Sequence, residues 1–221
     1  RLLEYGLKRP VHVGADLAFL LESAHHAPTD SGGPIGINLR PLFANRRERG
    51  HNKQSHRDAF EAGCRDLVQR LAGEHERVGL LPFCEEDEQF MRGLGLTDHA
   101  PMLPFSPDPD QVMARIQRCA AIVGMRFHAL VFATLSRVPW APIIYAPKSL
   151  QLSTEAGIDT QGLCAGDGSV LPEADFEPSC VVDALNAAMA GSDLSELAEA
   201  KRRAAADDFV ACWKQLTAEQ A

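Results

Sequence analysis

The sequence predicts an α/β protein in which helices flank a parallel β-sheet. One observation leads to this class, and a second limits the number of domains. Short apolar runs alternate along the chain with segments of helical periodicity. In addition, 45% of the 221 residues are hydrophobic and 24% are charged, which is enough for one well-buried domain, or one domain with an appendage, but not for two full domains. A disordered tail and a mini-protein are therefore excluded.

Six short apolar runs are predicted strands, and together they would form a Rossmann-like layer. They span residues 10–13, 35–40, 77–82, 101–104, 120–124 and 141–145. Four segments between them have the pattern of helices. These cover residues 54–72, 85–94, 109–119 and 126–137.

Capping residues mark the start of two helices. Asp108 can cap the third helical segment, because Pro109 follows at the first helical position, where a missing N–H costs nothing. Near the C-terminus, Ser192 can cap a long helix with one apolar stripe, which must dock on another part of the protein. Residues 160–178 carry three Gly and two Pro, and we interpret them as a loop with room for one short strand.

The charge of the chain argues against polyanionic partners. The 22 Lys and Arg against 30 Asp and Glu give a net charge of −8, so the surface as a whole repels nucleic acid and anionic membranes. No window approaches about 18 uninterrupted apolar residues, so we expect no integral membrane segment. The six Cys are scattered without metal-ligand spacing, and we interpret them as reduced and mostly buried, as in a cytoplasmic protein that binds no metal.

Cations gather where the predicted strands end. In open parallel sheets, ligands bind at the carboxyl ends of the strands, against the N-termini of the following helices. Four of the predicted strands are followed by unusual residues. After three of them comes a cation, namely Arg40, Arg126 and Lys148. The fourth exit carries the acidic run Glu85-Glu86-Asp87, which we interpret as the decorated start of a helix, where the dipole favours negative charge.

The exit after residues 120–124 is the most specific of the four. Gly124 lets the chain turn sharply, and Arg126 and His128 then fall in the first turn of the next helix. A cation there opposes the helix dipole by about 0.3–1 kcal/mol, a cost that an anion at the same place would offset. Arg supplies planar bidentate donors and His titrates near neutral pH, so the pair suits a phosphorylated carboxylic acid. The alternative is that Arg126 pairs with a carboxylate and that His128 is a satisfied buried histidine.

Longer stretches around this turn also follow a known order. The run GMRFHAL is followed, after an apolar helix, by VPWAPIIYAPK, and the pieces ADLAFLL, IGINLRP and RVGLLPFCEEDEQFM precede it. Over roughly residues 13–158, this order resembles the polysaccharide pyruvyl transferase family. The resemblance implies transfer of the carboxyvinyl part of phosphoenolpyruvate onto two hydroxyls of a sugar, giving a cyclic pyruvate ketal and phosphate. The acceptor would be a cell-surface polysaccharide or its precursor, and phosphoenolpyruvate would be the donor substrate, with no cofactor.

The resemblance also implies a two-domain, GT-B-like architecture, of which this chain would be the C-terminal half. Residues 1–33 would be the end of the preceding domain or a linker, residues 34–191 a Rossmann-like donor-binding domain, and residues 192–221 a C-terminal helix that packs back across the fold. The first residues have the pattern of the interior of a secondary-structure element, so we expect the chain to be part of a longer protein. We expect the protein in the cytoplasm, with the inner face of the membrane as a second candidate location. Whether it forms oligomers stays open.

The resemblance assigns the donor site to a few residues. Arg126 and His128 match the pair that binds phosphoenolpyruvate, and Phe127 between them would present its backbone N–H to the anion. Arg40 matches a further basic position, and Lys148 matches the Lys that follows the Tyr. His128 is the candidate to protonate the enol carbon before a sugar hydroxyl attacks. Alternatively, it only holds the phosphate, and a carboxylate elsewhere is the acid.

Three further features carry weaker signals. Asp16 is a candidate carboxylate of the site or a turn cap. Tyr145 is a candidate substrate contact, although Ala146 follows it where family members often have Asp or Asn. Residues 40–57 hold six of the 22 cations, and they are either a solvated loop or a lid that draws in an anionic donor.

Two other functions stay open. A GT-B glycosyltransferase that uses a nucleotide sugar would have the same sheet, but such sites set a carboxylate against donor hydroxyls, whereas this one has Arg126 and His128. A non-catalytic relative would keep the fold as a binding or scaffolding subunit. Two departures near the site keep this alternative open, namely Arg137-Val138 before Pro139, where family members often have Gly, and Ala146 after Tyr145. The transferase requires that the predicted cations converge on one pocket.

Overall fold

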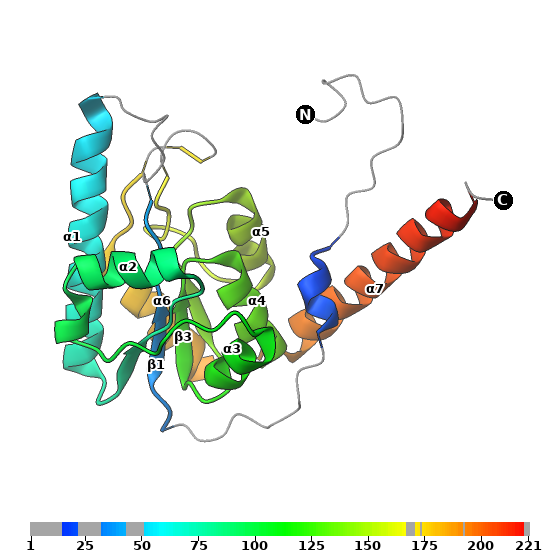
Figure 1. The fold of residues 1–221 in the computed structure, drawn as a ribbon, viewed down its shortest axis with the longest axis horizontal. Helices are drawn as coiled ribbons and strands as arrows, with labels where there is room; N and C mark the ends of the chain where they lie inside the picture. Colours follow the sequence, from blue (N-terminus) through cyan, green and yellow to red (C-terminus); the bar gives the residue numbers. More distant parts are fainter. Residues whose placement is uncertain are drawn as a thin grey trace.

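A four-stranded parallel sheet forms the centre of the computed structural model (Figure 1). The structure describes residues 15–21, 32–42, 51–166, 171–172, 174–191 and 193–218. The strands are β1 (Ile35–Asn38), β2 (Val78–Leu80), β3 (Ala121–Gly124) and β4 (Trp140–Pro142). They lie in the order β2-β1-β3-β4, so the chain moves outward from β1 to β2 and then resumes on the other side of β1. The α/β class and the Rossmann-like parallel sheet predicted from the sequence are confirmed.

Four of the six predicted strands are present, each shorter than predicted, and β4 begins one residue before its predicted start. Residues 101–104 contribute only an isolated bridge between Met102 and Leu80, so that prediction is wrong. Prolines stand at both ends of this run and have no N–H to donate, which keeps the pairing from extending. The predicted strand at residues 10–13 lies outside the described residues.

Seven α-helices flank the sheet within the described ranges. They are α1 (His51–Glu74), α2 (Glu85–Gly93), α3 (Pro109–Ile116), α4 (Phe127–Leu135), α5 (Pro147–Glu155), α6 (Pro178–Gly191) and α7 (Ser195–Ala218), with two short 3-10 helices, η2 (Leu17–Leu20) and η4 (Leu96–Asp98). The first four confirm the four predicted helical segments, whereas α5 and α6 were not predicted. The interpretation of residues 160–178 as a loop holds for the described part, where isolated bridges join Ile144 to Cys164 and Gly166 to Ala174.

The predicted cap of α3 is confirmed. The Asp108 side chain accepts a hydrogen bond from the Asp110 N–H at 3.0 Å, and Pro109 follows at the start of the helix. Ser192, the predicted cap of the last helix, lies outside the described residues. The Asp193 side chain instead accepts a hydrogen bond from the N–H of Ser195, the first residue of α7, at 2.9 Å, and this bond lowers the pKa of the Asp193 carboxyl.

Two hydrophobic clusters cover the two faces of the sheet. On one face, α1 and α6 share a cluster with β1, in which Leu67 and Val181 are fully buried. On the other face, α3, α4 and η2 pack together around Trp140. The first half of α7 joins this second cluster through Ala205, as does Leu194 just before the helix, and it lies against η2 and α4. The second half of α7 extends away from the sheet (Figure 1). The sheet edge at which the strands end is therefore held between two packed layers.

All six cysteines are free thiols, as predicted from their scattered positions. Cys64 and Cys119 are buried, and burial raises the pKa of both thiols, that of Cys119 to about 12. The other four are half-buried or exposed, so the prediction that most cysteines are buried is wrong. No helix in the described part of the chain combines the length and the apolar character needed to cross a membrane.

Gly36 fills a position in β1 that has no room for a side chain. A methyl group there would lie 2.5 Å from Leu81 Cδ1, 2.7 Å from Ile122 Cδ1 and 3.0 Å from Cys119 Sγ. We expect Gly36→Ala to lower the free energy of unfolding by about 1–3 kcal/mol, because three buried neighbours must shift. Urea denaturation measures the change.

Gly73 in α1 provides the matched control for this substitution. A methyl group at Gly73 meets nothing within 4 Å, so Gly73→Ala should raise the free energy of unfolding by about 0.4–1 kcal/mol. A Gly36→Ala protein as stable as the parent would contradict the packing described for β1.

Candidate functional site

The reversal of strand order brings the carboxyl ends of β1 and β3 side by side, with Asn38 opposite Gly124. This is the place at which doubly wound sheets bind ligands. Asn38 is fully buried and ties the strand ends together, since its Nδ2 donates to the Leu81 carbonyl and its Oδ1 accepts from the Arg126 backbone N–H, both at 2.9 Å. Asn38 was not among the predicted site residues, although a polar residue that ends an apolar run is a visible signal in the sequence.

Arg126 is held by a buried carboxylate at this edge. Its Nε donates to Asp87 Oδ2 at 2.7 Å and its Nη2 to Asp87 Oδ1 at 2.6 Å. Asp87 is completely buried, and its Oδ2 also accepts the Phe83 backbone N–H at 3.0 Å. These hydrogen bonds raise the pKa of the Arg126 guanidinium above its ordinary value, although burial opposes the shift. The alternative in which Arg126 pairs with a carboxylate is therefore present in the structure.

This pairing changes the interpretation of the acidic run. Glu85, Glu86 and Asp87 do begin α2, as predicted. Glu85 and Glu86 are exposed there, whereas Asp87 points inward to Arg126. The prediction that the run only decorates the helix start is thus wrong for Asp87. The two bonds to Asp87 use Nε and Nη2, so Nη1 of Arg126 has no partner among the described residues and stays available to a ligand.

Arg40 and Tyr145 lie together, although 105 residues separate them in the sequence. Arg40 follows β1 and its Nη1 donates to the Tyr145 hydroxyl at 3.0 Å, while its Cζ lies 4.8 Å from the centre of the Tyr145 ring. Its Nε is buried and has no hydrogen-bond partner in the described structure. Tyr145 thus positions a cation that no described carboxylate neutralises.

His128 is half-exposed at the start of α4. Its side chain is 50% exposed, and its Nε2 lies 3.5 Å from Asp16 Oδ2. The ring stands between Phe127 and Phe132, with centroid distances of 5.8 and 6.3 Å. Asp16 also accepts the Ala18 N–H through Oδ1 at 3.0 Å, so the predicted turn cap is confirmed, whereas its role as a carboxylate of the site stays a prediction. The alternative of a buried histidine is wrong.

The N-terminus of α4 has open backbone donors. Arg126 occupies the cap position without a capping side-chain bond, and the N–H groups of Phe127 and His128 have no acceptor among the described residues. Lys148, in the first turn of α5, places its Nζ 4.4 Å from the centre of the Phe127 ring. No carboxylate in the described ranges pairs with Lys148. Such a helix start, with a cation beside it, is suited to an anion.

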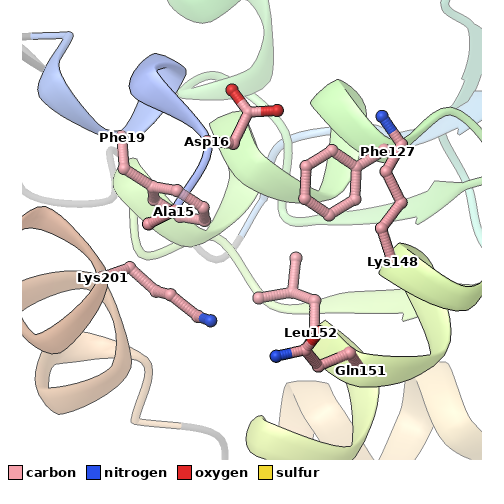
Figure 2. Close-up of a pocket in the computed structure, with 8 residues that line it drawn as sticks. All are labelled: Ala15, Asp16, Phe19, Phe127, Lys148, Gln151, Leu152 and Lys201. Atoms are coloured by element: carbon pink, nitrogen blue, oxygen red, sulfur yellow. The ribbon is translucent and has the colours of Figure 1, made fainter. Parts of the chain in front are cut away.

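A pocket of about 250 Å³ lies next to this helix start (Figure 2). Its lining consists of Ala15, Asp16, Phe19, Phe127, Lys148, Gln151, Leu152 and Lys201. Three of the predicted residues, Asp16, Phe127 and Lys148, are thus brought together. The side chains of Arg40, Arg126 and His128 come from the same edge of the sheet but are not part of this lining. Of the four residues required to converge, only Lys148 lines this pocket, so the pocket does not gather the predicted cations.

Five residues of the pocket were not predicted, and two of them, Gln151 and Lys201, are polar. Gln151 lies in α5 and Lys201 in α7, and Lys201 forms an ion pair with Glu155. Sequence periodicity identifies the apolar stripe of α7 but not the place at which that helix docks, so Lys201 gave no signal. No group of three or more His, Cys, Asp or Glu side chains in the described part of the chain is placed to hold a metal ion.

Comparison with known proteins gives one match. A family model described as polysaccharide pyruvyl transferase matches residues 1–147, which is more than half of the chain. The matched range includes the carboxyl ends of all four strands and stops just before Lys148. Neither a curated protein nor a solved structure matches the chain.

Proposed function

Because the chain belongs to the polysaccharide pyruvyl transferase family, we propose that it transfers the carboxyvinyl group of phosphoenolpyruvate to two hydroxyls of a saccharide. The products would be a cyclic pyruvate ketal and phosphate. The family match supports pyruvyl transfer to a polysaccharide in general. The proposal of phosphoenolpyruvate as the donor rests on the residues that lie where the strands of the sheet end.

The observation that carries the proposal is the start of α4. The backbone N–H groups of Phe127 and His128 are open there, and two cations without a described carboxylate partner, Arg40 and Lys148, come from the neighbouring strand exits. Phosphoenolpyruvate carries a phosphate and a carboxylate, so it uses several donors at once. In a protein of net charge −8, such a group of cations attracts a small anion locally.

The proposed reaction balances with one proton donor. A hydroxyl of the sugar forms a bond to C2 of phosphoenolpyruvate while C3 gains a proton and becomes a methyl group. The bond between C2 and the phosphate oxygen then breaks, and the second hydroxyl bonds to C2. Of the two protons that the hydroxyls lose, one replaces the proton given to C3 and the other leaves with phosphate. His128 is our candidate for the proton transfer, since it is half-exposed and beside the open helix start.

The nucleotide-sugar alternative gains no support from these contacts. It calls for a carboxylate that binds donor hydroxyls, whereas Asp87, the buried carboxylate at this edge, already accepts hydrogen bonds from Arg126 and from the Phe83 backbone. Asp87 is therefore already engaged and is not available to bind donor hydroxyls at the end of β3.

Calorimetric titration of phosphoenolpyruvate tests the proposed donor. Lys148→Gln should weaken binding about tenfold or more, since it removes one charge-assisted contact. Arg118→Gln is the matched control, because it removes the same charge from an exposed residue that precedes β3 and so lies at the opposite edge of the sheet. No binding to the parent protein, or equal weakening in both variants, would exclude this donor site.

A further inference from the structure

The pocket next to the start of α4 has a composition that differs from an anion site. It lies between η2, α5 and α7, and in Figure 2 the Lys201 side chain extends from α7 while Gln151 and Leu152 belong to α5. Gln151 and Lys201 fall outside the range that the family model matches, so no comparison assigns them a role.

The polar groups of the pocket include both donors and acceptors. Lys148, Lys201 and the Gln151 amide nitrogen donate, whereas the Asp16 carboxylate and the Gln151 amide oxygen accept. Phe19 and Phe127 stand on opposite sides of the pocket and add apolar surface (Figure 2). A sugar ring needs the same combination, because its hydroxyls donate and accept and its C–H faces are apolar.

The charges in and beside the pocket balance. Lys148, Lys201 and Asp16 line the pocket, and Glu155 lies beside it in an ion pair with Lys201, which makes two ammonium groups and two carboxylates in all. Burial disfavours the ionised form of Glu155, but hydrogen bonds from Lys201 and Gln151 outweigh it and hold the pKa of this carboxyl below its ordinary value. Glu155 thus keeps its charge and neutralises Lys201. A balanced pocket gives no preference to anions, and a bound phosphoenolpyruvate next to it would repel a second anion.

We propose that this pocket binds one neutral pyranose ring of the acceptor saccharide. The inference rests on the proposed function and adds the place and the charge class of the acceptor. A volume of about 250 Å³ lies just below the range of about 300–1,000 Å³ of typical ligand pockets, so it takes one ring and not an oligosaccharide.

The position of the pocket agrees with this role. Phe127 and Lys148 border both the pocket and the open start of α4, so a sugar and the donor would lie next to each other. Asp16 lines the pocket and its Oδ2 lies 3.5 Å from His128 Nε2. A sugar hydroxyl bound at Asp16 would therefore be close to the imidazole of His128, our candidate for the proton transfer.

Saturation-transfer NMR on the 221-residue chain tests the inference. The probes are the methyl pyranosides of glucose, galactose and mannose, with methyl glucuronide and inorganic phosphate as anionic probes, each in the absence and presence of phosphoenolpyruvate. We expect at least one neutral glycoside to bind, and methyl glucuronide to bind more weakly than methyl glucoside. Lys201→Met and Gln151→Leu should each weaken the neutral glycoside up to about tenfold.

Arg203→Met is the matched control, since Arg203 is an exposed cation of the same helix that is not part of the lining. It should bind the glycoside as the parent does, and a thermal melt shows whether each variant is folded. The inference is overturned if no neutral glycoside binds, if glucuronide or phosphate binds more tightly, or if both pocket variants bind as the parent does. Calorimetry with phosphoenolpyruvate on the same samples separates the two proposals: binding of the donor without any neutral sugar contradicts this inference alone, whereas loss of donor binding contradicts the proposed function.

Discussion

Asp87→Asn is expected to lower the free energy of unfolding by about 3 kcal/mol or more. The carboxylate is completely buried and accepts two hydrogen bonds from Arg126 and one from the Phe83 N–H. An amide cannot accept the paired bonds of the guanidinium, so the substitution leaves a partly buried charge without its counterion. We place the effect at the low end for a broken buried pair, because 24% of the Arg126 side chain is exposed and retains some solvation. Urea denaturation measures this change.

Glu86→Gln is the control for Asp87→Asn. Glu86 is the preceding residue, its Oε2 lies 3.8 Å from the same Arg126 Nη2, and its side chain is 56% exposed. Such an exposed ion pair contributes about 0–1 kcal/mol. If the two amide variants lose equal stability, Asp87 does not have the structural role described for it.

His128→Gln is expected to lower the rate of pyruvyl transfer about 10²–10⁴-fold, which is the usual contribution of a general acid or base. Glutamine keeps a hydrogen-bonding side chain but does not exchange a proton near neutral pH. The affinity for phosphoenolpyruvate should change only a few-fold, because the open N–H groups at the start of α4 belong to the backbone. Phosphate release with a saccharide acceptor measures the rate, and calorimetry measures the affinity.

The split between rate and affinity also tests the other role considered for His128. If the variant loses affinity as much as rate, His128 holds the phosphate and another group supplies the proton. His99→Gln is the control, since His99 is exposed at the end of η4 and contacts Gln69. A His128→Gln protein that retains its rate would exclude a catalytic role for this residue.

The sequence was sufficient to predict the class of the fold and the edge of the sheet to which the candidate site residues are brought. Alternation of apolar runs and helical segments predicts a parallel sheet, and the ends of its strands deliver Arg40, Arg126, His128 and Lys148 to one edge. The false strand at residues 101–104 shows the limit of that pattern, since prolines at its ends prevent a ladder.

The partners of these residues could not be predicted from local patterns. Arg126 and Asp87 are 39 residues apart, and their pairing depends on how the start of α2 is placed beside the end of β3. Lys201 reaches the pocket only because α7 docks against η2 and α4. A helical pattern shows which face of a helix is apolar but not the register at which that face packs, so contacts of this kind require the structure.

The most direct test of the anion site is a two-dimensional ¹H–¹⁵N NMR titration of the chain with phosphoenolpyruvate. Our account predicts saturable shifts of the backbone amides of Phe127 and His128, since these two N–H groups have no acceptor among the described residues. The amide of Arg126 already donates to Asn38 and should move less. Saturable binding that leaves the Phe127 and His128 amides unchanged, or no saturable binding at all, would contradict the account.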